Sequence, residues 1–105
     1  VDPSEFFKNS LSVYKTGKTE KIELLFSVEL ADFIFERAWH KSQTTKFNKD
    51  GTLIFNAELG ITPELIQWVL GFGANVQVIA PRTLNQMIAL EVEKLSQIYL
   101  IKKAA

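Results

Sequence analysis

The pattern of hydrophobic and polar positions predicts a strand over residues 21–26 and a helix directly after it. Alternate residues of the strand are apolar and share one face, which we expect to be buried: Ile22, Leu24 and Phe26. Ser27 is a suitable N-cap for a helix that runs to Trp39. One stripe of this helix is apolar at helical spacing: Leu30, Ala31, Ile34, Phe35 and Ala38.

Residues 43–59 predict a β-hairpin. Its turn is Asn48-Lys49-Asp50-Gly51, a type I signal in which the glycine supplies a positive φ. A loop of three residues, 49–51, places Phe47 near Leu53 and on the core face, whereas a two-residue loop would turn Phe47 to the other face. We favour the three-residue loop because it buries the aromatic ring. The core face of the second strand then holds Leu53, Phe55, Ala57 and Leu59.

A second helix is predicted from Thr62 and Pro63, a capping residue and a proline at the first helical position. The glycine-containing stretch 71–73 ends this helix. A short strand then runs to Pro81, and its inward-facing residues are Val76 and Val78. The rest of the chain has the periodicity of one long amphipathic helix, with the apolar stripe Leu84, Ile88, Val92, Leu95 and Tyr99.

The predicted order is strand, helix, strand, strand, helix, strand and then an additional helix. This is the order of the ferredoxin-like βαββαβ sandwich, in which two helices cover one face of a four-stranded antiparallel sheet. Right-handed crossovers place the first and third strands at the centre of the sheet. We therefore predict an α+β fold, a ferredoxin-like sandwich with an additional C-terminal helix.

Composition limits the function without identifying it. The chain has 105 residues, enough for one domain with its own core, and 47% of them are hydrophobic. Lys and Arg together number 12, as do Asp and Glu, so the chain lacks the net positive charge that is typical of nucleic-acid-binding domains. No cysteine is present for disulfide or thiol chemistry. No apolar run approaches the ~20 residues of a membrane span, so we expect no membrane contact.

His40 is the first candidate for chemistry because it is the one histidine of the chain. A general base or a metal ligand needs partners, and Glu36, four residues earlier, has a spacing too common to indicate one. We interpret the residues around His40 as a structural junction between the first helix and the second strand: Trp39, His40, Ser42 and Gln43. Ser42 and Gln43 are expected to satisfy free carbonyl groups at the helix end, and Trp39 to pack between helix and sheet. We predict no catalytic, metal-binding or cofactor-binding residue.

Known functions of this topology require residues that the chain lacks. Acylphosphatase-like enzymes have a glycine-rich loop after the first strand and an arginine directed at phosphate, but residues 24–30, LLFSVEL, have neither. RNA-recognition motifs stack bases on aromatic residues of the two central strands. The open face here carries instead Lys21, Glu23, Leu25, Thr52, Ile54, Asn56 and Glu58. We therefore predict that the chain is not an enzyme and that its open sheet face does not stack nucleic-acid bases.

The open sheet face holds a small apolar patch. Leu25, Ile54 and Ile79 are expected side by side at its middle, inside a polar rim, which suggests an association surface. The last helix is expected to cover part of this face. Aromatic residues near the N-terminus also need a partner: Phe6, Phe7 and Tyr14. We therefore expect a homodimer in which the N-terminal segment or the last helix meets a second copy.

Three stretches carry a family resemblance: KIELLFSVELADFIFERAWHKSQ, DGTLIFNAEL, and TPELIQWVLGFGANVQVIAP followed by RTL. Over residues 20 to about 90 they resemble the C-terminal extension domain of WYL-domain transcriptional regulators. The matching features are a V-x-L-x-F-type strand, the W-H-x-S-Q junction, the D-G hairpin and a G-x-x-(V/I)-x-V-(I/L)-x-P ending. The chain shows neither a DNA-recognition helix nor the Trp-Tyr-Leu triplet.

The resemblance implies a place in a longer protein. In that family a winged helix-turn-helix domain binds DNA, a central WYL domain senses a ligand, and the extension follows. Residues 19–105 would be the extension and residues 1–18 a connector from a missing upstream domain, which agrees with a first residue that is valine.

The function implied is that of a C-terminal regulatory or dimerisation module of a bacterial, cytoplasmic transcription regulator. It would contribute to effector response, share a small-molecule or nucleic-acid effector with the missing WYL domain, and meet DNA only through the missing helix-turn-helix domain. The alternative is a stand-alone ACT-like small-ligand-binding domain, which has the same topology. ACT domains usually carry a glycine-bearing loop after the first strand, and this chain does not.

Overall fold

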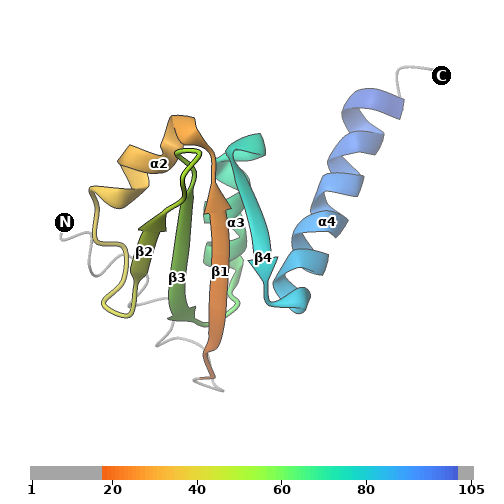
Figure 1. Cartoon of the computed structure of the whole chain (residues 1–105). Helices are drawn as coiled ribbons and strands as arrows, with labels where there is room; N and C mark the ends of the chain where they lie inside the picture. Colours follow the sequence, from red (N-terminus) through yellow and green to blue (C-terminus); the bar gives the residue numbers. More distant parts are fainter. Residues whose placement is uncertain (1–17, 102–105) are drawn as a thin grey trace.

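An antiparallel sheet with helices on one of its faces makes up residues 18–101, the part of the chain that the computed structural model describes (Figure 1). Most of the predicted connector, residues 1–17, lies outside these residues. The elements in chain order are β1 (Glu20–Phe26), α2 (Val28–Phe35), β2 (Thr44–Phe47), β3 (Leu53–Leu59), α3 (Pro63–Gly71), the 3₁₀ turn η2 (Gly73–Asn75), β4 (Val76–Ala80), α4 (Arg82–Ser96) and the π-helical end η3 (Gln97–Ile101).

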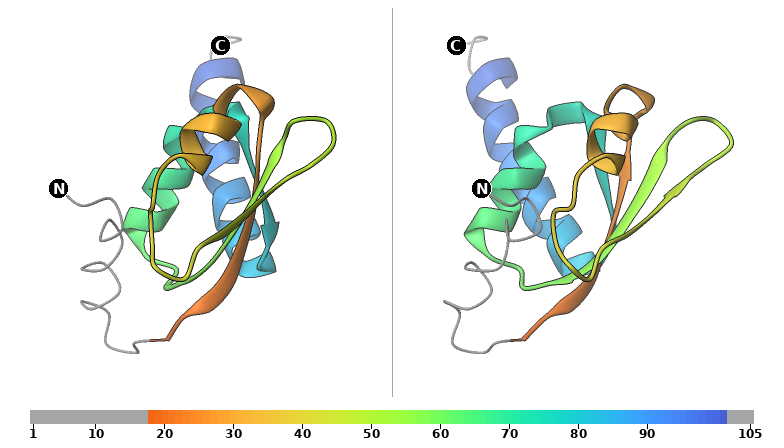
Figure 2. Two further views of the ribbon diagram at one scale, coloured as in Figure 1. Left: turned by 60° about the vertical axis from the view of Figure 1, so that its left-hand side comes forward. Right: turned by 90° about the vertical axis from the view of Figure 1, so that its left-hand side faces the viewer.

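The sheet has the predicted topology. Within the described residues its strand order is β2-β3-β1-β4, so β1 and β3 are the central strands, and each neighbouring pair is antiparallel. Helices α2 and α3 cover one face, and no helix of the described residues lies on the other, which we call the open face (Figures 1 and 2). The ferredoxin-like α+β prediction with an additional C-terminal helix is confirmed.

The covered face of the sheet provides most of the hydrophobic core. The predicted inward residues of the two central strands are fully or nearly fully buried: Ile22, Leu24, Phe26, Leu53, Phe55, Ala57 and Leu59. Ala31 and Ile34 of α2 and Leu65 and Val69 of α3 are buried against them. The period-two pattern of the two central strands therefore identified their core face correctly.

Helix α2 is shorter than predicted. It ends at Phe35, with Glu36 as its C-cap, so Ala38 lies beyond the helix and is exposed, as is Phe35. The predicted stripe is thus correct only in its first two turns. The chain leaves the helix early because Trp39 turns back to be buried, as described below.

The hairpin has the predicted register. Phe47 pairs with Leu53, the Asn48 N–H donates to the Thr52 carbonyl at 2.8 Å, and Gly51 has a φ of 92°. Phe47 points to the same face as the core but remains 41% exposed. Its ring meets that of Phe35, 5.0 Å away between centroids. The expectation that it joins the core was too strong, because β2 is an edge strand and the helix layer ends above it.

The start of α3 follows its sequence signals. Thr62 is buried, and its hydroxyl accepts a hydrogen bond from the Leu65 N–H at 3.1 Å, while Pro63 occupies the first helical position. After the helix, Gly73 adopts a φ of 60°, a conformation that favours glycine, and the chain enters β4 through η2. The capping and glycine signals thus place this helix correctly.

Helix α4 does not lie on the open sheet face, so that expectation was wrong. It runs beside β4 on the side of α3, and its C-terminal part extends away from the domain (Figures 1 and 2). The Asn85 side chain donates to the Val78 carbonyl at 2.9 Å, which ties the first turns of α4 to β4. Leu84 is buried and Ile88 packs against the core, but the rest of the predicted stripe is exposed: Val92, Leu95 and Tyr99.

Candidate functional site

The loop between α2 and β2 folds back so that Trp39 is buried. The Trp39 side chain is 8% exposed, and its ring lies 5.2 Å from that of Trp68 on α3 and 5.9 Å from that of Phe33, between centroids. Its indole N–H donates to the Ile34 carbonyl at 3.3 Å, near the end of α2. Trp39 thus joins the two helices of the covered face.

The Gln43 side chain organises the backbone of this loop. Its amide oxygen accepts hydrogen bonds from the N–H groups of Trp39 at 2.6 Å and His40 at 3.2 Å. Its amide nitrogen donates to the Arg37 carbonyl at 2.9 Å. One side chain therefore satisfies three backbone groups that the early end of α2 leaves without helical partners.

Ser42 and His40 connect the same loop to the sheet. The Ser42 hydroxyl accepts from the Glu58 N–H of β3 at 2.8 Å and lies 2.7 Å from His40 Nδ1. The Ser42 N–H also donates to Nδ1, at 3.1 Å. Ser42 thus extends the β2–β3 pairing. It does not satisfy a carbonyl group of α2, although the sequence had suggested that it would. The ring nitrogen Nδ1 is an acceptor here, which requires a neutral imidazole.

Burial and charge favour the same neutral form of His40. The pKa of its imidazole is lowered from the usual value of 6.5, first by burial and then by the positive charge of Lys41. The unfolded chain therefore binds this proton more readily than the folded one. The contribution of His40 to stability is complete above about pH 6.5 and is lost as the pH falls through the folded-state pKa.

We predict that His40→Asn removes this pH dependence, because the asparagine side-chain oxygen can take the place of Nδ1 as an acceptor and does not titrate. Urea unfolding of both proteins at about pH 7.5 and about pH 5.5, on either side of the usual histidine pKa of 6.5, measures it. The native chain should lose more stability at the lower pH than His40→Asn does. An equal loss in both proteins would contradict this account of the junction.

The rest of the described chain offers little reactive chemistry. Among residues 18–101, no group of three or more His, Cys, Asp or Glu side chains is placed to hold a metal ion. The pKa of the Asp50 carboxyl is lowered, mainly by its hydrogen bond from the Thr52 side chain. That carboxylate belongs to the hairpin turn, and it receives the Thr52 backbone N–H as well. The lowered pKa is therefore explained by local turn structure.

The apolar patch on the open sheet face is narrower than the sequence suggested. Leu25 and Ile54 are direct cross-strand partners, and both are partly buried. On the other side of Leu25, however, the register places Gln77 opposite, not Ile79. The register irregularity between Glu23 and Leu24 leaves Ile79 without a pairing partner on β1, and its side chain is 45% exposed. The patch thus consists of an adjacent pair and one offset residue.

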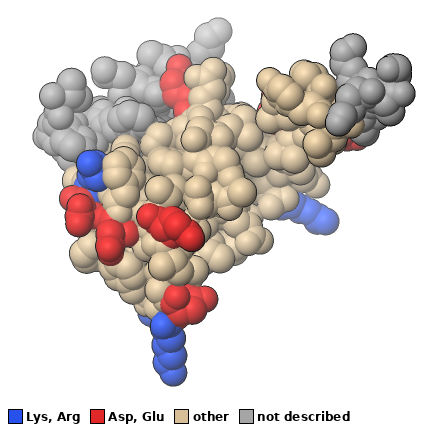
Figure 3. Space-filling model, turned by 90° about the horizontal axis from the view of Figure 1, so that it is seen from above, with Lys and Arg blue, Asp and Glu red and all other residues tan. Residues whose placement is uncertain are grey.

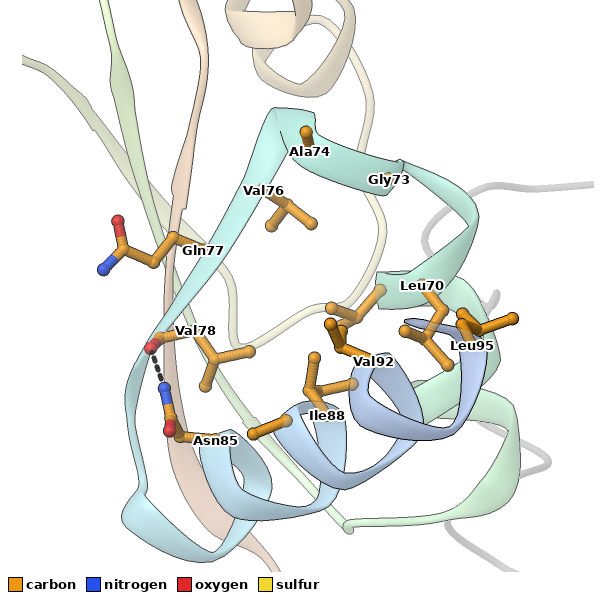
Figure 4. Close-up of a pocket in the computed structure, with 12 residues that line it drawn as sticks. Leu70, Gly73, Ala74, Val76, Gln77, Val78, Asn85, Ile88, Val92 and Leu95 are labelled. Carbon is orange, nitrogen blue, oxygen red and sulfur yellow. Dashed lines mark hydrogen bonds between the residues drawn. The ribbon is translucent and has the colours of Figure 1, made fainter. Parts of the chain in front are cut away.

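A groove of about 380 Å³ lies between β4, α3 and α4. In Figure 4, Val76 and Val78 face Ile88 and Val92 across it, whereas Gln77 points away. Its lining contains no charged residue, and the amide of Asn85 is held by the Val78 carbonyl at one end. The groove can therefore receive apolar groups, and its shape results from the way α4 diverges from β4.

Residues 18–96 match the WCX domain family. The chain belongs to this family. WCX domains are the C-terminal extensions of WYL-domain transcription regulators, which confirms the resemblance seen in the sequence. No curated protein sequence matches the chain.

The match places the whole of the sheet and its helices inside the WCX domain. It begins just before β1 and ends at the last residue of α4, so it includes the Trp39–Gln43 junction, the open sheet face and the groove. No helix of the WCX domain, within the residues described, is long and apolar enough to cross a membrane.

One surface of this WCX domain was missed by the sequence reasoning. Besides the stripe toward the groove, α4 and its π-helical end η3 carry a second apolar face formed by Met87, Leu90 and Ile98, each about half exposed. The space-filling view from above shows the arm formed by α4 as mostly uncharged (Figure 3). The helical spacing of these residues is visible in the sequence. The prediction of a single apolar stripe on this helix left them out.

Proposed function

We propose that this WCX domain is a regulatory module of a bacterial WYL-type transcription regulator, contributing to effector response and to self-association and not to catalysis. The family match over residues 18–96 is the observation that carries the proposal. Since that family works within regulators, DNA is contacted through a helix-turn-helix domain encoded elsewhere in the protein, and the effector is a small molecule or nucleic acid shared with a WYL domain. The regulator acts in the cytoplasm, where its DNA is.

The described structure supports a scaffold and contact role. Among the described residues, hydrogen bonds of Trp39, His40, Ser42 and Gln43 join parts of this domain to one another, which supports their role as a structural junction. The apolar surfaces lie elsewhere, on the open sheet face and along α4. An ACT-like ligand domain is less well supported, because Ser27 alone joins β1 to α2 and its hydroxyl bonds to the Asn75 side chain at 2.9 Å.

The test is a map of chromosomal occupancy and transcription for the tagged product of the whole gene. We expect that product to occupy promoters, and deletion of codons 18–101 to change transcript levels at those promoters. His40→Asn in the same gene is the matched control, because a structural junction predicts an unchanged response. If the product occupies no promoter, or if the deletion leaves every transcript unchanged, the proposed function is wrong.

A further inference from the structure

Helix α4 presents an exposed face that the domain does not use. The side chains of Met87, Leu90 and Ile98 are 46%, 54% and 57% exposed, and Leu95 at the border of this face is 44% exposed. At helical spacing they form a face beside the one that carries Leu84 and Ile88, the residues that attach α4 to the core. Because the C-terminal part of α4 projects from the domain, this face is open to another molecule (Figures 1 and 2).

The residues on this face are arranged symmetrically about the point between Val92 and Glu93. Positions equally far from that point on either side are chemically matched: Met87 with Ile98, Leu90 with Leu95, and Glu91 with Lys94. When two identical helices lie antiparallel about a two-fold axis at this point, each position of one helix lies at the same level as its matched position on the other. Apolar residues then meet apolar residues, and an acid meets a base.

We propose that α4 pairs antiparallel with α4 of a second copy of this chain, about a two-fold axis between Val92 and Glu93. At the centre, Glu91 of each copy faces Lys94 of the partner subunit, and the apolar pairs flank these contacts on both sides. This rests on the self-association part of the proposed function and identifies the surface that carries it.

The charges also select the orientation of the helices. In a parallel pair in register, Glu91 would face Glu91 and Lys94 would face Lys94, and like charges repel. The antiparallel arrangement replaces both repulsions by attractions. Within one chain, Lys94 Nζ lies 3.3 Å from Glu91 Oε2, and the Lys94 and Glu91 side chains are 63% and 42% exposed. Both groups therefore remain available to a partner.

The apolar content favours α4 over the open sheet face as the contact. On the sheet, Leu25 and Ile54 are already partly buried and Ile79 is offset from them. On α4, four large apolar side chains are about half exposed along one face. A single helix pair buries less than a standard interface, so we expect association that depends on concentration.

Sedimentation of the 105-residue chain from about 1 μM to about 1 mM, the range of weak interfaces, tests the pairing. We expect a monomer–dimer equilibrium that Glu91→Lys or Lys94→Glu weakens by about tenfold, because each change places like charges opposite one another. The double variant carrying both changes should dimerise within about threefold of the native chain, since the opposite charges are restored in exchanged positions. An equimolar mixture of the two single variants should also associate, because one then carries two cations and the other two anions.

Two control variants make the result specific. Glu93→Lys changes the charge of the same helix away from the pairing face and should leave dimerisation unchanged. Ile54→Lys combined with Ile79→Lys tests the open sheet face, and a circular-dichroism melt of every variant verifies that it folds.

The outcomes separate the two proposals. The α4 pairing is wrong if neither single charge change weakens the dimer, or if only the Ile54→Lys, Ile79→Lys variant dissociates it. Self-association itself would still hold in both cases. A native chain that is monomeric throughout overturns self-association and, with it, the pairing. The regulatory role is decided separately, by promoter occupancy.

Discussion

Replacing Phe55 with alanine is expected to lower the free energy of unfolding by about 3–5 kcal/mol. Phe55 lies on the central strand β3 and is fully buried. Its ring is 6.2 Å from that of Phe26 in an edge-to-face arrangement and 5.9 Å from that of Trp68, between centroids. The change removes these contacts and leaves a cavity between the sheet and α3. A domain of this size is stabilised by only about 5–15 kcal/mol, so the variant should be close to unfolding at moderate urea concentrations.

Phe47→Ala is the matched control for this prediction. It changes the same residue type on the neighbouring strand β2, but the Phe47 ring is 41% exposed and meets that of Phe35, itself an exposed residue. We expect a loss of about 1 kcal/mol or less, as for a partly solvated side chain. If urea melts show a loss below about 1 kcal/mol for Phe55→Ala as well, the assignment of the buried sheet face is inverted.

Local sequence signals predicted those parts of the fold whose partners are close in the chain. The turn at Asn48–Gly51 set the register of β2 on β3, and the cap at Thr62 set the start of α3. The alternation in β1 and β3 identified the buried face because both strands are central and have one covered side. In each case the deciding interaction joins residues within one element or one hairpin.

The errors concern elements whose ends are decided by distant contacts. Helical periodicity continues past Phe35, yet α2 ends there because Trp39 is buried against Trp68, a residue of α3. The predicted stripe of α4 meets the core only at Leu84 and Ile88, and the predicted position of the helix was wrong, because the hydrogen bond of Asn85 to the Val78 carbonyl fixes the helix beside β4. Periodicity shows which face of a helix is apolar and not what covers it.

The candidate site was predicted to a similar extent. The hydrogen bond of Gln43 to the Arg37 carbonyl agrees with the expected use of that residue at the helix end. Ser42 instead bonds to β3, a contact that requires the three-dimensional sheet. The patch of Leu25, Ile54 and Ile79 and the homodimer stay predictions. The structure adds the second face of α4, whose spacing is visible in the sequence but whose exposure depends on how the helix packs.

Replacing Trp39 with alanine is the second change expected to have a large effect, again about 3–5 kcal/mol of unfolding free energy. The Trp39 ring is buried between Phe33 and Trp68, and its indole N–H satisfies the Ile34 carbonyl at the end of α2. Alanine removes the ring contacts between the two helices and leaves that carbonyl without this partner. The loop that Gln43 organises should then lose its attachment to the core.

Trp39→Phe separates the two contributions in the same urea melts. Phenylalanine keeps most of the ring contacts but cannot donate to the Ile34 carbonyl, so we expect a smaller loss, of about 1–2 kcal/mol. A role of Trp39 in stacking on a ligand, by contrast, would require an accessible ring and would let alanine be tolerated in the isolated domain. If Trp39→Ala unfolds at the same urea concentration as the native chain, the structural interpretation of the junction is wrong. A large loss in Trp39→Ala with an intermediate loss in Trp39→Phe is the result that burial of this ring requires.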